Sequence, residues 1–546
     1  MSWNRRRPAI GADPSSATGF AGKHRGMNML TVNKRQFLIG SAGATLAATM
    51  PWYAQAQARK IMVLASTVDI PNFDPHVATG YAPQWLFRNT YDALVRVVGN
   101  PPETKPGLAR SWTQSEDGLT YTFELDETAR FHDGNPVTAK DVEYSFARLL
   151  RLKRGPAWMV SGVLDETSVK ATGDMTVTMS LMQPFAPLLS VLPWMFVVNA
   201  KAVEANLGSD DGQAYLLSNM AGSGAFRMGR ARPGDLYELI RAQNDWHQGG
   251  NIEGAIWKIV RESATTRLML QRGEVHFALD MFTEDMEAIE GMPNVVRIME
   301  PDYRSFSIKM NTAKGPLADK NLRKAISYAY NYQSMLEAAG FAELMEGPLP
   351  SGMLGHASGL DVYRYDMDKA KEYLAKSEHK DGGFTLSIMH AAGYENQRRW
   401  CLILLESLKA LNIDLDIRPM VWPDIVAMAK SPDTMTDFYS IFQSANYADP
   451  DNTAFAAYHS SRNGQWQNPV YANPEVDRLI EAARAEVDTQ KRADLYRQFQ
   501  ELVVDDAPDI FGVLELRKFA MRDSVQGYEF CPVAANTFEI WPLSLA

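Results

Sequence analysis

The sequence predicts a mixed α/β fold with at least two domains, and three observations support this prediction. A chain of 546 residues is longer than one hydrophobic core organises, so a second domain is expected. With 46% hydrophobic and 22% charged residues, the composition is that of an ordinary globular protein. From about residue 59 onward, strand-like alternation and helix-like apolar stripes follow each other repeatedly, which favours an α/β architecture.

Several elements of the first half can be placed from local patterns. Apolar residues alternate with polar ones over residues 119–125 and again over residues 175–181, which predicts two half-buried strands. Thr138 stands three residues before Asp141, a capping-box pattern that predicts the start of a helix. The expected apolar stripe of this helix comprises Val142, Phe146 and Leu149.

The second half is predicted to be richer in helices. Residues 322–339 are expected to form one helix that ends at Gly340. Asn473 and Pro474 mark the start of a helical hairpin, whose turn is expected at Asp488. Because no internal repeat and no low-complexity linker is found, separate lobes would be joined by short ordered strands that act as a hinge.

Composition and motifs exclude several function classes. A net charge of −10 argues against a nucleic-acid partner. The sequence contains no phosphate-binding loop, no His-Glu-x-x-His motif and no His pair at metal-ligand spacing near a cysteine, so no cofactor or metal is expected. Two cysteines, Cys401 and Cys531, allow at most one disulfide, and their separation leaves open whether they pair. Ser223 fails the nucleophile-elbow pattern because Ala221 replaces its first glycine.

The first 58 residues resemble an export signal that is cleaved. A charged part at residues 33–35 precedes an apolar stretch at 37–50, and small residues follow at 54–58. Lys34 stands where a twin-arginine signal has its first Arg, so either that route or the general secretion route is expected. Translation is expected to begin at Met27 or Met29. Without a cysteine near the cleavage region, we expect a periplasmic protein that carries no lipid anchor.

The remaining chain resembles a known family. One run of about 40 residues has its motifs in the family's order and spacing. It comprises Pro106-Gly107-Leu108-Ala109, Ser111-Trp112, Asp117 to Phe123, Phe131-His132-Asp133-Gly134, Thr138 to Val142 and Ser145-Phe146. Further matches are Asn89 to Leu94, Pro184 to Leu188, Gly222 to Phe226, Gly273-Glu274-Val275, Leu322 to Ile326 and Ala448-Asp449-Pro450-Asp451. These segments resemble the peptide/nickel/opine-type solute-binding proteins of bacterial ABC importers, which include dipeptide- and oligopeptide-binding proteins.

The resemblance implies a two-lobed periplasmic-binding-protein-like fold that closes on a solute like a clamshell. Lobe one would comprise residues 59–302, with an extra subdomain at about 100–215. Lobe two would comprise residues 303–526, and residues 527–546 would return to lobe one. A monomer that captures a peptide or small solute and delivers it to the permease subunits of the inner membrane is expected, not an enzyme.

The resemblance also implies where a solute would bind. Dipeptide and oligopeptide binders carry an Asp three residues before the signature Asp, here Asp449, and this Asp pairs with the peptide's α-ammonium group. The matching residue here is Asn446, unless the alignment slips by one position. Loss of that charge-assisted bond costs on the order of 1.5–3 kcal/mol. The other candidate ligand-binding residues are Tyr81, Met281, Phe282, Tyr303, Arg304, Arg398, Arg399, Trp422, Gln443, Tyr447 and Asp449.

Asn446 keeps a second class of solute open. The alternative to a peptide is an opine, a sugar or sugar phosphate, or a metal chelate carried by the same transport mechanism. A secreted hydrolase is the alternative from another function class.

Overall fold

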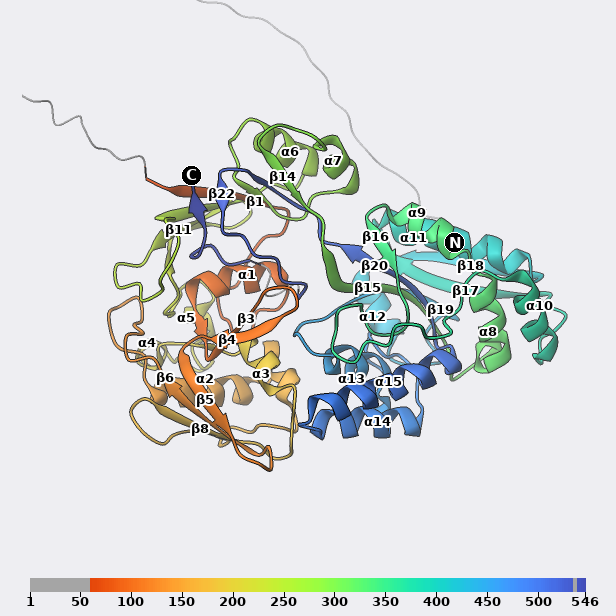
Figure 1. Ribbon diagram of the computed structural model, residues 1–546, viewed down its shortest axis with the longest axis horizontal. Coiled ribbons are helices and arrows are strands. Elements are labelled where there is room, and N and C mark those ends of the chain that lie inside the picture. Colours follow the sequence, from red (N-terminus) through yellow and green to blue (C-terminus); the bar gives the residue numbers. More distant parts are fainter. Residues whose placement is uncertain (1–58, 534–537) are drawn as a thin grey trace, which may run out of the picture. The chain divides into compact units, whose positions relative to one another are not determined.

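The computed structural model describes residues 59–533 and 538–546. These residues belong to one compact unit, Ala58–Ala546. The predicted export signal, with Lys34 and both candidate start methionines, lies outside the described residues. Helices and strands alternate along the chain, which confirms the mixed α/β prediction (Figure 1).

The first large sheet has seven strands. Their order is β10 (Phe226–Arg232), β11 (Leu236–Arg241), β12 (Gly254–Ile259), β1 (Ile61–Ser66), β13 (Phe277–Ala278), β21 (Phe519–Arg522) and β14 (Val295–Ile298). Strand β1 is parallel to β12 and β13, whereas β21 is antiparallel to both β13 and β14. The helices that follow or precede these strands are α1 (Tyr81–Thr90), α6 (Ser263–Gln271) and α7 (Thr283–Ala288). A cluster of buried aromatic rings that includes Trp85, Trp257, Phe277 and Phe519 fills the core beside this sheet.

A four-stranded antiparallel sheet is inserted between β1 and β10 along the chain. Its order is β5 (Ala109–Gln114), β6 (Thr120–Leu125), β8 (Thr176–Ser180) and β7 (Val169–Ala171). Strands β6 and β8 confirm the two strands predicted from alternation. Helix α2 (Ala139–Leu152) begins as predicted, with Thr138 and Asp141 forming a reciprocal capping box. Val142, Phe146 and Leu149 of this helix are buried in the core beside the sheet.

Short elements complete this part of the chain. The two-stranded sheets are β2 (Asp92–Ala93) with β9 (Phe196–Val197), β3 (Val95–Val98) with β4 (Glu103–Pro106), and β22 (Val525–Gln526) with β23 (Ser544–Leu545). The short helices are η1 (Gly155–Val160), α3 (Leu188–Val191), η2 (Leu192–Trp194), α4 (Ala200–Glu204) and α5 (Gln213–Leu216).

The second large sheet has six strands. Their order is β16 (Ala342–Leu344), β20 (Asp509–Leu516), β15 (Pro301–Met310), β19 (Phe438–Ser444), β17 (Phe384–Ala391) and β18 (Ile413–Met420). Its helices are η3 (Pro316–Ala318), α8 (Lys320–Ala329), α9 (Tyr332–Ala339), α10 (Met367–Lys376), α11 (Glu395–Lys409), α12 (Trp422–Met428), α13 (Asp451–Tyr458) and η4 (Ser460–Arg462). The predicted hairpin is confirmed as α14 (Pro474–Ala485) and α15 (Thr489–Asp506), which lie side by side in Figure 1.

The single helix predicted over residues 322–339 was wrong. The segment forms two helices, α8 and α9, with a break at Tyr330 and Asn331. Tyr330 is in an extended conformation, and the Asn331 side chain accepts a hydrogen bond from the Ser334 backbone N–H. Asn331 therefore caps a new helix, which the apolar periodicity alone did not reveal.

The chain crosses between the two large sheets twice. The first crossing joins β14 to β15 at Ile298–Pro301, and the second joins β20 to β21 at Leu516–Phe519. The expected lobe boundary at 302/303 lies next to the first crossing, whereas the expected boundary at 526/527 lies beyond β21, which pairs in the first large sheet. The lobes as rigid bodies remain a proposal.

Two further features concern thiols and charge. Cys401 and Cys531 are both buried thiols, and no disulfide joins them; burial raises the pKa of each to about 12.

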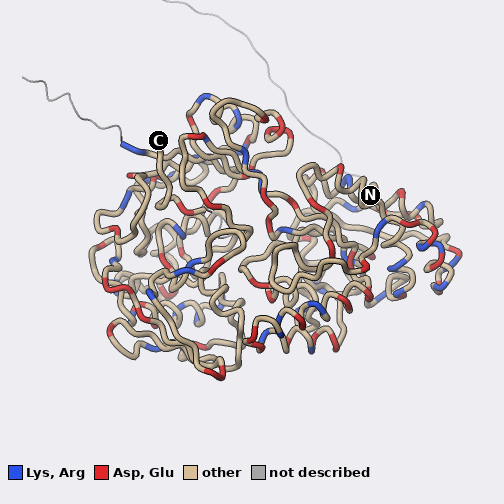
Figure 2. Tube along the Cα trace, viewed as in Figure 1, with Lys and Arg blue, Asp and Glu red and all other residues tan. Residues whose placement is uncertain are grey.

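Lys and Arg are interspersed with Asp and Glu along the described chain (Figure 2). No helix in the described ranges has both the length and the apolar character needed to cross a membrane.

Candidate functional site

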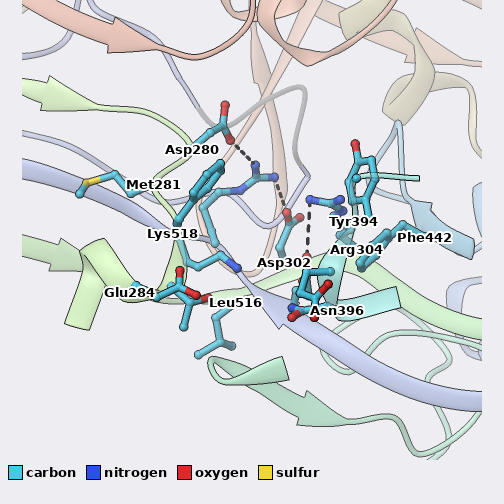
Figure 3. A pocket seen from close by; sticks show the side chains of 16 residues that line it. Asp280, Met281, Glu284, Asp302, Arg304, Tyr394, Asn396, Phe442, Leu516 and Lys518 are labelled. Atoms are coloured by element: carbon cyan, nitrogen blue, oxygen red, sulfur yellow. Dashed lines mark hydrogen bonds and ion pairs between the residues drawn. The ribbon is translucent and has the colours of Figure 1, made fainter. Parts of the chain in front are cut away.

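A cavity of about 490 Å³ lies at the two crossings, and we name it the crossing cavity (Figure 3). Its walls come from the segment between β13 and α7, the start of β15, the segment between β17 and α11, β19, and the second crossing. The lining residues are Asp280, Met281, Phe282, Thr283, Glu284, Asp302, Arg304, Gly393, Tyr394, Glu395, Asn396, Phe442, Glu515, Leu516, Arg517 and Lys518.

Several of the residues that line the crossing cavity form ion pairs with one another. Arg517 pairs with Asp302 and lies 3.7 Å from Asp280, and Arg304 lies 3.5 Å from Glu515 (Figure 3). Burial raises the pKa of Asp302, and the attraction of Arg517 and Arg304 offsets only part of that rise. Arg517, in the second crossing, thus joins Asp302 at the start of β15 to Asp280, which follows β13 of the first large sheet.

Aromatic side chains form the cavity's open rim. Phe282 is 58% exposed and Tyr394 is 55% exposed, although each lines the cavity. Deeper inside, the guanidinium of Arg304 lies 4.3 Å from the centre of the Phe442 ring. Large exposed rings at a cavity mouth are available for stacking on a solute.

A second cavity, of about 430 Å³, is lined by three indole rings, and we name it the indole cavity. One wall is formed by the residues before α1, by η1 and by the end of η2, and the other by the segments that follow β19 and η4. The lining residues are Thr79, Gly80, Gly155, Pro156, Trp158, Met159, Trp194, Asn446, Arg462, Gln465, Trp466 and Gln467.

Asn446 is held in this cavity by both walls. The Trp194 indole N–H donates to the Asn446 carbonyl oxygen at 2.5 Å. The Asn446 backbone N–H and its Nδ2 both donate to Asn452 Oδ1, at 3.1 and 3.3 Å. Asn446, at the position that the resemblance singled out, is therefore one of the residues that line a cavity.

Among the described residues that line the indole cavity, Arg462 is the one charged side chain. Its guanidinium lies 5.9 Å from the centre of the Trp158 ring and 5.8 Å from that of Phe455. Its Nε is buried without a hydrogen-bond partner. Burial lowers the pKa of Arg462, the Tyr447 hydroxyl counteracts this in part, and Arg484 adds to the lowering.

Tyr81 has neighbours in the linings of both cavities. It follows Gly80 of the indole cavity at the start of α1, and its side chain hydrogen-bonds to Ser444 of β19. The charges of Asp302, Arg304 and Arg517 also act on the Tyr81 hydroxyl, whose pKa is raised chiefly by burial. Tyr81 therefore links the start of α1 to β19 of the second large sheet.

The remaining predicted residues divide into two groups. Met281 and Arg304 line the crossing cavity with Tyr81 nearby, as described above. The buried group makes internal contacts: Tyr303 donates to the Gly352 carbonyl at 2.8 Å, Tyr447 to Asp451 at 2.8 Å, and Gln443 to the Gln467 carbonyl at 3.3 Å. Asp449 accepts two hydrogen bonds of 2.6 Å from Arg492.

Arg398, Arg399 and Trp422 lie at the edges of these sites. Both arginines are exposed and pair with Glu395, which itself lines the crossing cavity. Trp422 is 45% exposed and meets Trp466 of the indole cavity edge-on, with ring centres 5.5 Å apart. Solute contact by each predicted residue remains a prediction.

Sequence reasoning missed much of the lining. Three charged residues, Glu515, Arg517 and Lys518, interrupt the otherwise uncharged run from Ile510 to Met521, and that interruption was the one signal available for them. No sequence motif marks the residues of the indole cavity that were missed, because they come from segments far apart in the chain. These residues are Trp158, Trp194, Arg462 and Trp466. Across residues 59–533 and 538–546, no group of three or more His, Cys, Asp or Glu is arranged to hold a metal ion.

Comparison with known proteins gives one family match. The model of "Bacterial extracellular solute-binding proteins, family 5 Middle" matches residues 103–465. A protein of Escherichia coli K12 named "Probable D,D-dipeptide-binding periplasmic protein DdpA" is 30% identical over 515 residues, which cover 91% of this chain and 97% of that protein.

Solved structures with the same fold hold different solutes. The periplasmic binding protein DppA from Helicobacter pylori, in complex with the peptide STSA, has a TM-score of 0.74 and 24% identity, covering 89% of this chain and 98% of its own. AgaA from A. tumefaciens R10, in complex with agropinic acid, has a TM-score of 0.73 and 20% identity, covering 89% and 99%. These matches confirm the predicted periplasmic-binding-protein-like fold.

Proposed function

Because the chain belongs to the bacterial extracellular solute-binding proteins of family 5, and is therefore a non-catalytic binding component of an ABC transporter, we propose that it captures a peptide or peptide-like small solute. The solute would be enclosed between the segments of the two large sheets and delivered to membrane permease subunits. Family membership rules out the alternative of a secreted hydrolase.

The observation that carries this proposal is the presence of two cavities, the crossing cavity and the indole cavity. Both are lined by residues from before the first crossing and from after it. Small-molecule sites are concave and usually have volumes of about 300–1,000 Å³. The volumes of the crossing cavity, about 490 Å³, and of the indole cavity, about 430 Å³, both fall in this range. A solute bound across both walls would favour the closed arrangement by its differential affinity for it.

The proposed location is the periplasm, because the relatives named above are periplasmic proteins and residues 1–58 have the pattern of an export signal. A non-peptide solute is the second candidate. Asn446 favours it, since a carboxamide supplies no negative charge for an α-ammonium group, and a relative of the same fold holds agropinic acid.

Native mass spectrometry of the protein purified from its own periplasm would test the proposal. We expect a bound small solute whose mass is released by mild denaturation, in a ratio of one per chain. A protein that releases no solute, and whose unfolding temperature is unchanged by a library of di- and tripeptides, would contradict the proposed function.

A further inference from the structure

The indole cavity has an unbalanced charge. Among the twelve lining residues that belong to the described part of the chain, no Asp or Glu occurs, and Arg462 is the one charged side chain. Within the described part of the chain, Arg462 forms no ion pair, and its buried Nε has no acceptor. A buried donor of a guanidinium group that lacks an acceptor is costly unless a ligand supplies one.

The neighbours of Arg462 hold the guanidinium at the cavity wall. The rings of Trp158 and Phe455 lie within 6 Å of it, and Arg484, a second cation, lies close enough to lower its pKa. Stacking on indole and phenyl faces leaves the N–H edge of a guanidinium available for a planar acceptor. A carboxylate fits such an edge through two parallel hydrogen bonds.

Asn446 lines the same cavity, and its carboxamide is uncharged. It therefore supplies no negative charge to pair with an ammonium group. Its carboxamide is tied to Asn452, and its carbonyl to Trp194. An ammonium group placed here would face Arg462 with no carboxylate in the lining to compensate. The indole rings offer a face to a cation, but Arg462 already occupies that of Trp158.

Building on the proposed function, we infer that the indole cavity selects solutes that present a carboxylate, and no primary ammonium group, to Arg462. Arg462 and Asn446 are its specificity-determining residues, the first by attraction and the second by the absence of a charge. Two sources share a net negative charge: a peptide whose N-terminus is blocked, and an opine-type imino diacid, whose second carboxylate balances the charge of its own secondary ammonium group.

Isothermal titration calorimetry with a matched set of probes tests this inference. The probes are Ala-Phe, N-acetyl-Ala-Phe, N-acetyl-Ala-Phe amide and the imino diacid N-(1-carboxyethyl)alanine. We expect N-acetyl-Ala-Phe or the imino diacid to bind at least roughly 10-fold more tightly than Ala-Phe, and the amide to bind more weakly than its acid. Which of the two anionic probes binds distinguishes the two sources.

Variants assign the preference to the two residues. Arg462→Gln is expected to weaken binding of the anionic probe roughly 10- to 100-fold, and Arg462→Lys to recover part of that loss. Asn446→Asp is expected to reverse the preference in favour of Ala-Phe. Arg272→Gln, a change of the same kind at an exposed arginine remote from both cavities, should leave all affinities unchanged.

The outcomes separate this inference from the proposed function. If Ala-Phe binds as tightly as the anionic probes, or if Arg462→Gln folds normally and keeps their affinity, the inference is wrong while solute capture stands. If no probe binds, the inference is also wrong. Release of a peptide with a free N-terminus in native mass spectrometry would then still support solute capture.

Discussion

At the residue scale, Asp449 of the family signature forms a buried ion pair with Arg492. Its carboxylate is 5% exposed and accepts two hydrogen bonds from Arg492, which is itself buried. Such a bidentate pair uses both carboxylate oxygens, so the position holds α15 against the segment that follows β19.

Asp449→Asn should therefore destabilise the protein. The change leaves the Arg492 charge buried without a counter-ion, and we expect a loss of about 3–5 kcal/mol in the free energy of unfolding. Urea denaturation measures this loss, with Asp433→Asn at an exposed ion pair as the control. Solute affinity should not change in the folded variant; a selective loss of affinity without a loss of stability would show that Asp449 contacts the solute.

A second residue-scale feature is the buried His247, which lies between two carboxylates. Its ring nitrogens lie 2.9 Å from Asp92 and 2.7 Å from Asp245, and the rings of Trp246 and Trp541 pack beside it. Burial opposes the charged ring, but Asp92 and Asp245 outweigh it and raise the pKa of His247 to about 9. The ring is therefore protonated at neutral pH.

Because the pKa of His247 is raised, the stability that its ion pairs with Asp92 and Asp245 contribute depends on pH. It is fully present below about pH 6.5, the ordinary value for histidine, and is lost as the pH rises through about 9. Between pH 6 and pH 10 the wild type should lose on the order of 3 kcal/mol more unfolding free energy than His247→Gln. Parallel stability curves for the two proteins over that range would refute the assignment.

At the element scale, sequence signals worked where local chemistry decides the structure. The capping box of Thr138 and Asp141 predicted the start of α2, because the reciprocal hydrogen bonds involve four neighbouring residues. The break between α8 and α9 escaped prediction, because the apolar stripe continues through it while Asn331 caps a new helix. Periodicity reports the buried face of a segment and not the continuity of its hydrogen bonds.

Thr138→Ala should shorten or loosen the first turn of α2. Loss of a helix cap of this kind costs about 1 kcal/mol, which denaturation of the variant in urea would measure. Thr113→Ala, on an exposed position of β5, is the matched control and should change stability by less than half of that amount. Equal losses in the two variants would show that the cap is not the cause.

At the scale of the whole molecule, the site depends on segments that the chain brings together from opposite ends. The resemblance predicted a cleft between two lobes, and Asn446 in it, because that information is carried by a motif. Trp158, Trp194 and Arg462 could not be predicted, because each lies in a different segment and only the folded chain places them in one cavity. Arg517 and Lys518 were missed because the second crossing carries no motif.

The rim of the crossing cavity gives a prediction at this scale. Phe282 and Tyr394 come from opposite sides of the first crossing and present exposed rings to the same cavity. Phe282→Ala and Tyr394→Ala should each weaken solute binding roughly 2- to 10-fold, as expected for the loss of one stacked ring. The unfolding temperature without solute should stay the same, because both rings are more than half exposed.

Calorimetry and thermal unfolding of these variants measure both effects. Tyr365→Ala is a suitable control, because Tyr365 is 56% exposed and is absent from the lining of both cavities. If the two rings close on the same solute molecule, the double variant should lose less affinity than the two single losses added together. Full additivity would indicate that the rings contact the solute independently.

The position of β21 has a consequence for the order in which the chain can fold. This strand fills the place between β13 and β14, and its residues, Phe519–Arg522, come near the end of the chain. Asn251 likewise bonds to Leu545, one residue before the last. During synthesis, β13 and β14 therefore lack their common partner strand until the chain has been made as far as β21. Unpaired strand edges can pair with the wrong strand, so β13 and β14 remain prone to mispairing until β21 is available.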